Sequence, residues 1–438
     1  MTLWEIKQKI ISLIDENREE LIFLSKQIEN NPELGFCEEK TAVLIREKFS
    51  ELGINCKYPL AVTGTIGEIS GRNSDFNICI IGEMDALKCS GSVIEGQMGQ
   101  AHACGHHAQV ASMLGAAIGL AKSGVMQELD GKVSFLAAPA EEFIDLDYRK
   151  KLKNDGKIQY FGGKQQLIAE GAFDDIDMAL MIHAQPKEEN RKIYVRGNNL
   201  GFLAKTITFH GKAVHGSTPF DGVNALNAAA LAILGMHANR ETFQEEEKIR
   251  IHPIITKGGD VVNSVPDEVV IETYIRGAAF EDIKKGNRAV ERACVGAAKM
   301  VGAEVVFENM PGYLPLQESC ELSEIMENNA AYLMGEKNLI FGEEITGSSD
   351  IGDLSNILPV VQPSIGGFSG ALHSQEFCIA DYETAVLLPA KIMALTAAEL
   401  LYDGAREAKK VKEKYVPKMT KNEYICYLEE LQGGKKDE

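Results

Sequence analysis

Residues Ala101 to Gln109 read AHACGHHAQ, which places three of the nine histidines and one cysteine within six positions. Imidazole nitrogen and thiolate sulfur are the ligands that zinc and related divalent ions prefer in proteins. A single histidine here would fit a surface loop or the start of a helix equally well. The density of ligand types favours a metal site, which requires further ligands from elsewhere in the chain.

Glu141 and Glu142 follow an apolar run, and an acidic pair in that position is often only the start of a loop. A hydrolytic metal site, however, needs carboxylate ligands and one unligated carboxylate that takes a proton from water. The two glutamates can divide these roles. His183 and His373 are further candidate ligands, although a lone histidine is more often a packed or surface residue.

Short apolar runs that end in polar residues alternate with apolar helical segments in the first half of the chain. We expect strands within 76–87, 131–142 and 177–186, and a helix over 110–124. This alternation predicts an α/β fold with a mainly parallel sheet and helices on both faces. Functional residues of such sheets gather at the carboxyl ends of the strands, where the sequence places Asp85, Glu141, Glu142 and His183.

The pattern changes from about Asn198. The order strand, helix, two strands, helix and strand predicts an inserted α+β domain of ferredoxin-like type at 198–310, with its elements expected at 204–216, 224–239, 249–259, 267–277, 279–302 and 304–310. The catalytic domain would then comprise 1–197 and 311–438.

The composition limits the classes of function. A length of 438 residues suggests two domains, and a net charge of -19 argues against a nucleic-acid partner. We expect no signal peptide and no apolar run long enough to span a membrane. Nine scattered cysteines without a CxxC pair fit reduced thiols in the cytoplasm.

Eight segments together resemble, in order, the dinuclear-metal amidohydrolases related to hippurate hydrolase, plant indole-acetyl-amino-acid hydrolases and aminobenzoyl-glutamate hydrolase. The resemblance covers roughly residues 18 to 400, and any one motif alone would be weak. The segments read NPELGFCEEKTA, GEMDAL, HACGH, PAEE, GKAVHGSTP, VNSVPD with Arg276 after it, GSSDIGDLS and GGFSGALHS.

This resemblance implies a role for each matching residue. Two divalent ions, manganese or zinc, would be bound by Cys104, His106, Glu142, His183 and His373, with the Cys104 thiolate between them. Glu141 would be the general base, and Asp85 would orient the site. The inserted domain would be a lid and dimerisation domain of a homodimer. In that domain His215 would reach the neighbouring subunit's active site, and Asn263 and Arg276 would bind the carboxylate of the substrate.

The chain departs from the family pattern at three positions near the metals. The family usually has Asp and His where this chain has His107 and Gln109, and commonly Asp in place of Glu83. The segment 145–166 is also longer than in simple family members. It is interpreted as a surface insertion, or alternatively as a loop that shapes the acyl pocket.

We therefore expect a cytoplasmic metal-dependent amidohydrolase that acts on small N-acyl amino acids with a free carboxylate. A dipeptidase that uses the same dinuclear site is the closest alternative. A metal-dependent binding protein without catalysis is a second alternative, and the presence of Glu141 argues against it.

Overall fold

The structure is a computed structural model that describes residues 1–94, 97–342 and 347–432, and its chain divides into two compact units. Unit 1 consists of Met1–Asn198, Gln317–Glu344 and Asp353–Lys418. Unit 2 consists of Asn199–Leu316, Ile345–Gly352 and Met419–Glu438.

Unit 1 is built on a six-stranded sheet with the order β1-β2-β6-β3-β7-β15. Strands β6, β3, β7 and β15 run parallel to one another, whereas β1 and β2 form an antiparallel edge. The predicted α/β fold with a parallel sheet is thus confirmed. The strands span Asn55–Leu60 (β1), Gly64–Ser70 (β2), Asn77–Glu83 (β3), Lys132–Ala138 (β6), Met178–Leu180 (β7) and Val360–Val361 (β15).

The central strands of this sheet are buried because their sequences are almost entirely apolar. Every residue of β3 is buried, as expected for a parallel strand that is covered on both faces. The register pairs Glu83 with Ala138, so β3 and β6 end side by side. The acidic residues that follow the two strands therefore emerge at the same edge of the sheet.

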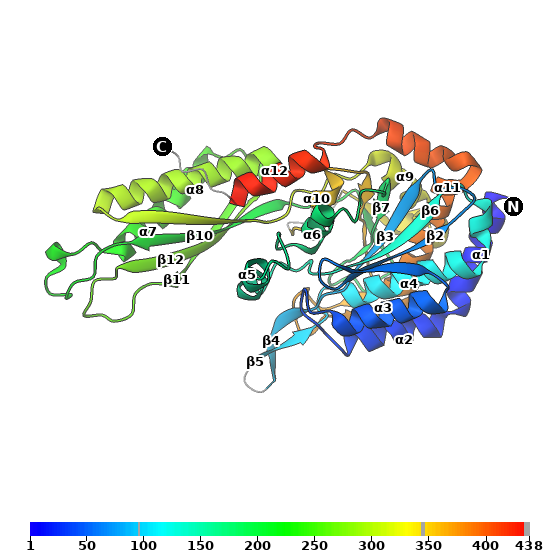
Figure 1. Ribbon diagram of the computed structural model, residues 1–438, viewed down its shortest axis with the longest axis horizontal. Helices are drawn as coiled ribbons and strands as arrows, with labels where there is room; N and C mark the ends of the chain where they lie inside the picture. The colour runs from blue at the N-terminus through cyan, green and yellow to red at the C-terminus, as the bar shows by residue number, and fades with distance from the viewer. Residues whose placement is uncertain (95–96, 343–346, 433–438) are drawn as a thin grey trace. The chain divides into compact units, whose positions relative to one another are not determined.

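Helix α4 (His106–Lys122) is the central helix of unit 1. All its residues from His106 to Leu120 are buried, because its own side chains are mostly small or apolar on every face. It packs on β3 and β6 and against α1, α2 and α11 (Figure 1). The other helices span Leu3–Glu16 (α1), Arg18–Glu29 (α2), Glu39–Glu51 (α3), Leu146–Asn154 (α5), Gly163–Glu170 (α6), Cys320–Met334 (α9) and Leu388–Lys414 (α11), and α10 (Ile351–Ser355) begins in unit 2 and ends in unit 1.

One helical segment corrects an expectation from the sequence. Glu383–Lys414, which includes α11, is long and apolar enough to cross a membrane by length and composition. However, 94% of its most apolar window is buried inside the protein, as in a core helix. Its apolar side chains pack against α4 and α9.

Short strands complete unit 1. A four-stranded sheet has the order β14-β9-β16-β8, and two strand pairs, β4 with β5 and β17 with β18, lie outside both larger sheets. These strands span Leu87–Ile94 (β4), Gln97–Ala101 (β5), His183–Ala184 (β8), Ile193–Val195 (β9), Leu339–Phe341 (β14), Ser364–Ile365 (β16), Phe368–Ser369 (β17) and Cys378–Ile379 (β18).

Unit 2 contains a four-stranded antiparallel sheet with the order β11-β12-β10-β13, on which α7 and α8 pack side by side (Figure 1). Along the chain the order is strand, helix, two strands, helix, strand, which matches the predicted ferredoxin-like pattern. The elements span Gly201–His210 (β10), Ala225–Ala238 (α7), Arg250–Lys257 (β11), Glu268–Gly277 (β12), Phe280–Val301 (α8) and Glu304–Pro311 (β13).

The C-terminal helix α12 (Lys421–Gln432) differs from the predicted domain division, which grouped 311–438 with the catalytic domain. The structure groups this helix with unit 2. The ring of Tyr427 meets that of Phe280 edge to face, with centroids 4.6 Å apart, and Leu431 contacts the core of unit 2. Burial of these apolar side chains explains the docking of a tail that is otherwise rich in charge.

Candidate metal centre

The carboxyl ends of three neighbouring parallel strands bring together the acidic residues and one histidine of the predicted site. Glu83 ends β3 and Asp85 follows it, whereas Glu141 and Glu142 come shortly after β6. His183 follows β7 and begins β8. The chain thus converges on this edge as expected for a parallel sheet.

The loop between β5 and α4 brings Cys104 and His106 to the same place. Gly105 between them has a φ of 84°, and a Cβ there would lie only 2.7 Å from the Cβ of Ala184. Only glycine combines this left-handed conformation with so close an approach. The tight bend leaves both Cys104 and His106 buried at the start of α4.

The five predicted ligands form two groups that share Cys104. Cys104, His106 and His183 make one group, and Cys104, Glu142 and His373 make the other, with ligand atoms within 4.8 Å of one another in each. Cys104 Sγ lies 3.5 Å from His183 Nε2, and Glu142 Oε1 lies 3.4 Å from His373 Nε2. A sulfur common to two groups is the arrangement that a bridging thiolate requires.

The Nδ1 atoms of the predicted ligands His106 and His183 are already engaged. His106 Nδ1 lies 2.8 Å from the Asp85 carbonyl oxygen and 3.1 Å from Asp85 Oδ1, and His183 Nδ1 lies 2.9 Å from the Ala184 carbonyl oxygen. These contacts direct both Nε2 atoms toward Cys104. Outer contacts of this kind orient the ligands of metal sites.

Asp85 also fixes the glutamate pair, because its Oδ2 accepts a hydrogen bond from the backbone N–H of Glu142 at 2.9 Å. Among the described residues, His106 Nε2 and Glu142 Oε1 are buried and have no hydrogen-bond partner. Buried polar atoms are costly when unpaired. Divalent ions fit these residues, since they would satisfy both atoms.

The electrostatics of the site favour a proton on Cys104 and on His106 when no cation is bound. Burial, and then the charge of Glu142, raises the pKa of the Cys104 thiol well above its usual value. Burial alone would lower the pKa of His106, but Cys104 and Glu83 outweigh burial and raise it well above its usual range. A bound cation reverses this preference, since it needs the thiolate and the neutral imidazole.

We therefore predict that metal binding releases protons. At neutral pH the Cys104 thiol, with its raised pKa, is protonated before binding and ionised after it. Each proton released makes the apparent metal affinity fall about tenfold per unit of decreasing pH. Titrations with Mn²⁺ or Zn²⁺ between pH 6 and 8 measure this slope. In Cys104→Ser the slope should be smaller by about one proton, and an affinity independent of pH in the wild type would contradict the prediction.

Glu141 is buried at the same edge, with Oε2 4.0 Å from His106 Nε2. It belongs to neither group that shares Cys104. It forms instead a third group of potential ligands with Glu83 and His106. Its place close to His106, but outside both groups that share Cys104, suits a general base.

The three residues that depart from the family pattern are all buried near the site. Gln109 Nε2 donates to Glu83 Oε2 at 2.9 Å, and Lys164 Nζ donates to Glu83 Oε1 at 2.6 Å. The ring of His107 packs against that of His102, with centroids 5.4 Å apart. Burial lowers the pKa of His107 well below its usual value, so the ring is neutral.

The segment 145–166 is not a simple surface insertion, because two of its cations are buried beside the site. Arg149 on α5 donates to the backbone carbonyls of Glu142 and Phe161, and lies 3.5 Å from that of Ala140. Lys164 on α6 is the partner of Glu83. Sequence reasoning missed both residues, since a run rich in Lys and Arg is typical of an exposed helix.

We predict that Arg149→Met destabilises the protein by roughly 3 kcal/mol, because buried carbonyl groups lose a charged donor. Lys151→Ala on the exposed side of the same helix is the control, with an expected change within about 0.5 kcal/mol. Denaturant unfolding measures both values. Equal stability of the two variants would show that Arg149 does not hold the Glu141–Glu142 loop.

Three predicted residues belong to unit 2. His215 Nδ1 lies 2.7 Å from Ser217 Oγ, and the ring is exposed. The Asn263 carbonyl accepts a hydrogen bond from Gly216 N at 2.7 Å, which brings Asn263 next to the His215 loop. Arg276 on β12 donates to Ser348 Oγ at 2.7 Å and lies over the rings of Phe202 and Tyr274, at 5.5 and 5.9 Å from their centroids.

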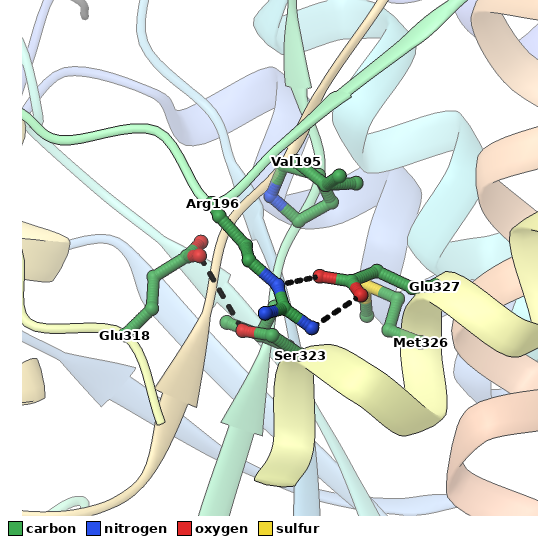
Figure 2. A pocket seen from close by; sticks show the side chains of 8 residues that line it. Val195, Arg196, Glu318, Ser323, Met326 and Glu327 are labelled. Carbon is green, nitrogen blue, oxygen red and sulfur yellow. Dashed lines mark hydrogen bonds and ion pairs between the residues drawn. The ribbon is translucent and has the colours of Figure 1, made fainter. Parts of the chain in front are cut away.

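A small pocket elsewhere in unit 1 is filled by internal contacts. Figure 2 shows the Arg196 guanidinium paired with both oxygens of Glu327, at 2.6 and 2.7 Å. Glu318 beside it accepts a hydrogen bond from Gln362 N at 2.7 Å, and burial raises its pKa to about 7. These contacts serve the packing of α9, and we assign the pocket no chemical role.

Comparisons with known proteins agree with this geometry. Residues 199–299, within unit 2, match the peptidase dimerisation domain of the M20 family. An IAA-amino acid hydrolase (ILR1-like 4) of Arabidopsis thaliana is 25% identical over 82% of this chain and 80% of its own. An Xaa-Arg dipeptidase of Mus musculus is 28% identical over 91% of this chain and 90% of its own. The chain is related to the M20 hydrolases. This relationship confirms the resemblance seen in the sequence motifs.

A solved structure supports the same fold. A Bacillus subtilis protein described as a dinuclear metal binding peptidase of the M20 family superimposes with a TM-score of 0.70. It covers 88% of this chain and 99% of its own, with 23% sequence identity. The fold shared with the Bacillus subtilis protein therefore extends over both units of the present chain.

Proposed function

We propose that this M20 relative is a metal-dependent amidohydrolase that cleaves the amide bond between an acyl or aminoacyl group and an amino acid with a free carboxylate. The observation that carries the proposal is the pair of ligand groups that share Cys104, with the Glu141 carboxylate 4.0 Å from His106 Nε2 and part of neither group. Cys104, His106, Glu142, His183 and His373 would hold two divalent ions, manganese or zinc.

The ions, when bound, would activate water and polarise the scissile carbonyl as Lewis acids. Glu141 would accept the proton of the attacking water and then donate it to the leaving amine nitrogen. Asp85 would keep His106 and the Glu142 backbone in place through the contacts described above. Hydrolysis by this route needs no covalent intermediate with the protein.

Unit 2 would supply the groups that recognise the substrate. Arg276 suits a substrate carboxylate because its planar guanidinium pairs with two oxygens at once. Its contacts with Ser348 and two aromatic rings fix its orientation. Asn263 would add a hydrogen bond to the same carboxylate, and His215 would stabilise the oxyanion.

We also propose that the protein is a homodimer that assembles through unit 2. The match to a peptidase dimerisation domain supports this assembly. Strand β11 is an edge of the sheet, and Ile254 and Ile255 on it are exposed, as is Leu234 on α7. Exposed apolar side chains on an edge strand and on a helix of the same unit favour pairing with another chain. A cytoplasmic location fits the nine free cysteines.

A panel of N-acyl amino acids and dipeptides, assayed with protein reconstituted with Mn²⁺ or Zn²⁺, tests the activity. We expect hydrolysis of N-acyl amino acids with a free carboxylate, and none of their amides or esters at that carboxylate. Hydrolysis of dipeptides alone would favour the dipeptidase alternative, which the similarity to the Xaa-Arg dipeptidase supports. Metal binding without turnover of any compound would favour a binding protein.

A further inference from the structure

Glu83 lies closer to the Nε2 atom of His106 than the general-base candidate Glu141 does. Glu83 Oε2 is 3.2 Å from His106 Nε2, and both side chains are fully buried. At this distance the pair could form a hydrogen bond, yet His106 Nε2 has no hydrogen-bond partner among the described residues. The two atoms are therefore close neighbours that no hydrogen bond joins.

Two atoms held side by side in this way are typical of neighbouring ligands on one cation. Ligands about 2.1 Å from a divalent ion are roughly 3 to 3.5 Å apart when they occupy adjacent positions. The predicted ligands show the same spacing, with 3.5 Å between Cys104 Sγ and His183 Nε2 and 3.4 Å between Glu142 Oε1 and His373 Nε2. Glu83 also belongs to a group of potential metal ligands with His106 and Glu141.

We propose that the Glu83 carboxylate is an additional ligand of the ion held by His106. The inference rests on the dinuclear centre proposed above and assigns it a sixth protein ligand. Glu141 Oε2 is farther from His106 Nε2, at 4.0 Å, and keeps the role of base. The ion at His106 would then have an oxygen ligand in addition to its sulfur and nitrogen ligands.

The surroundings of Glu83 hold its carboxylate in the orientation that a ligand needs. Lys164 Nζ donates to Oε1 at 2.6 Å, and Gln109 Nε2 donates to Oε2 at 2.9 Å. Oε2 has further acceptor capacity, so it can bind a cation while it keeps the Gln109 contact. Lys164, fully buried, balances the charge of the extra carboxylate.

Two features of the sequence fit this assignment. Glu83 and Gln109 are both departures from the family pattern, and here they contact each other. Carboxylate ligands suit manganese and other hard cations better than thiolate ligands do. The contribution of Glu83 to binding should therefore be larger for Mn²⁺ than for softer divalent ions.

The test compares wild-type protein with the double variant Glu83→Gln/Lys164→Met, which removes the buried ion pair without leaving either charge alone. Mn²⁺ titrations measure the two affinities, metal analysis gives the stoichiometry, and the visible spectrum of the Co²⁺ form reports the coordination number. We expect one of two ions to bind at least about tenfold more weakly, with a spectrum of lower coordination number. Unchanged affinities and spectrum would overturn the proposal.

Two controls separate the possible failures. Lys164→Met alone keeps the ligand, so it should retain both ions better than the double variant. If the double variant does not fold, Glu83→Asp keeps the charge but shortens the side chain, and the same tenfold loss is expected from it; an unchanged affinity overturns the proposal. If the wild-type protein binds no divalent ion at all, the proposed function itself fails, independently of Glu83.

Discussion

Glu141→Gln should reduce turnover by a factor of about 10² to 10⁴, because the amide cannot accept the proton of the attacking water. The change preserves the size of the side chain and removes only its basicity. Since Glu141 belongs to neither ligand group that shares Cys104, we expect the variant to bind both ions. The fall should appear in kcat, measured with saturating substrate on metal-loaded protein.

Glu142→Gln is the matched control for this prediction, since it makes the same chemical change one residue away. Glu142 Oε1 lies 3.4 Å from His373 Nε2 in one of the ligand groups, so its loss should weaken the binding of an ion. Metal analysis after dialysis distinguishes the two variants. Equal metal loss in both would show that the glutamates do not divide the roles of base and ligand.

The strand-end residues were predictable because a buried parallel strand has a simple sequence signature. The apolar runs before Asp85, Glu141 and His183 indicate strands that end at one edge of a sheet. The order of the strands in the sheet depends on the whole fold. Neighbouring parallel strands nevertheless end at the same edge of the sheet, whatever their order. The structure brings these residues together with Cys104 and His106.

Other parts of the site depend on contacts that local sequence does not encode. His373 lies in a loop between β17 and β18, and only the motif resemblance suggested that it joins Glu142. Lys164 is buried because it meets Glu83, which lies 81 positions earlier in the chain. Arg149 is buried because it meets backbone carbonyls, which have no sequence signature at all.

In unit 2, too, some elements were predictable from the sequence and others were not. Alternating burial along β12 and the apolar face of α8 made the ferredoxin-like order predictable from periodicity. The docking of α12 in unit 2 was not, because only a few apolar residues such as Tyr427 carry it in a charged tail. A short amphipathic segment can bury its apolar side against several surfaces, and the sequence does not select one.

The largest gain of activity is expected from mixing two inactive variants, Glu141→Gln and His215→Ala. In the structure His215 is exposed and its Nδ1 contacts Ser217, which leaves Nε2 for a contact outside its own loop. If two-fold dimers form at random, half of them contain one chain of each kind. When His215 acts on the partner's site, each mixed dimer has one intact site, which combines Glu141 of one chain with His215 of the other.

Coexpression of the two variants with different tags should therefore restore about a quarter of wild-type activity, since half of the dimers have half of their sites intact. Each variant alone should remain inactive, and tandem purification through both tags should enrich the activity to about half of wild type. A histidine that only stabilises its own loop through Ser217 leaves every site in the mixture defective. Doubly tagged dimers that stay inactive would thus exclude a site shared between subunits, while the Glu141 result would still stand.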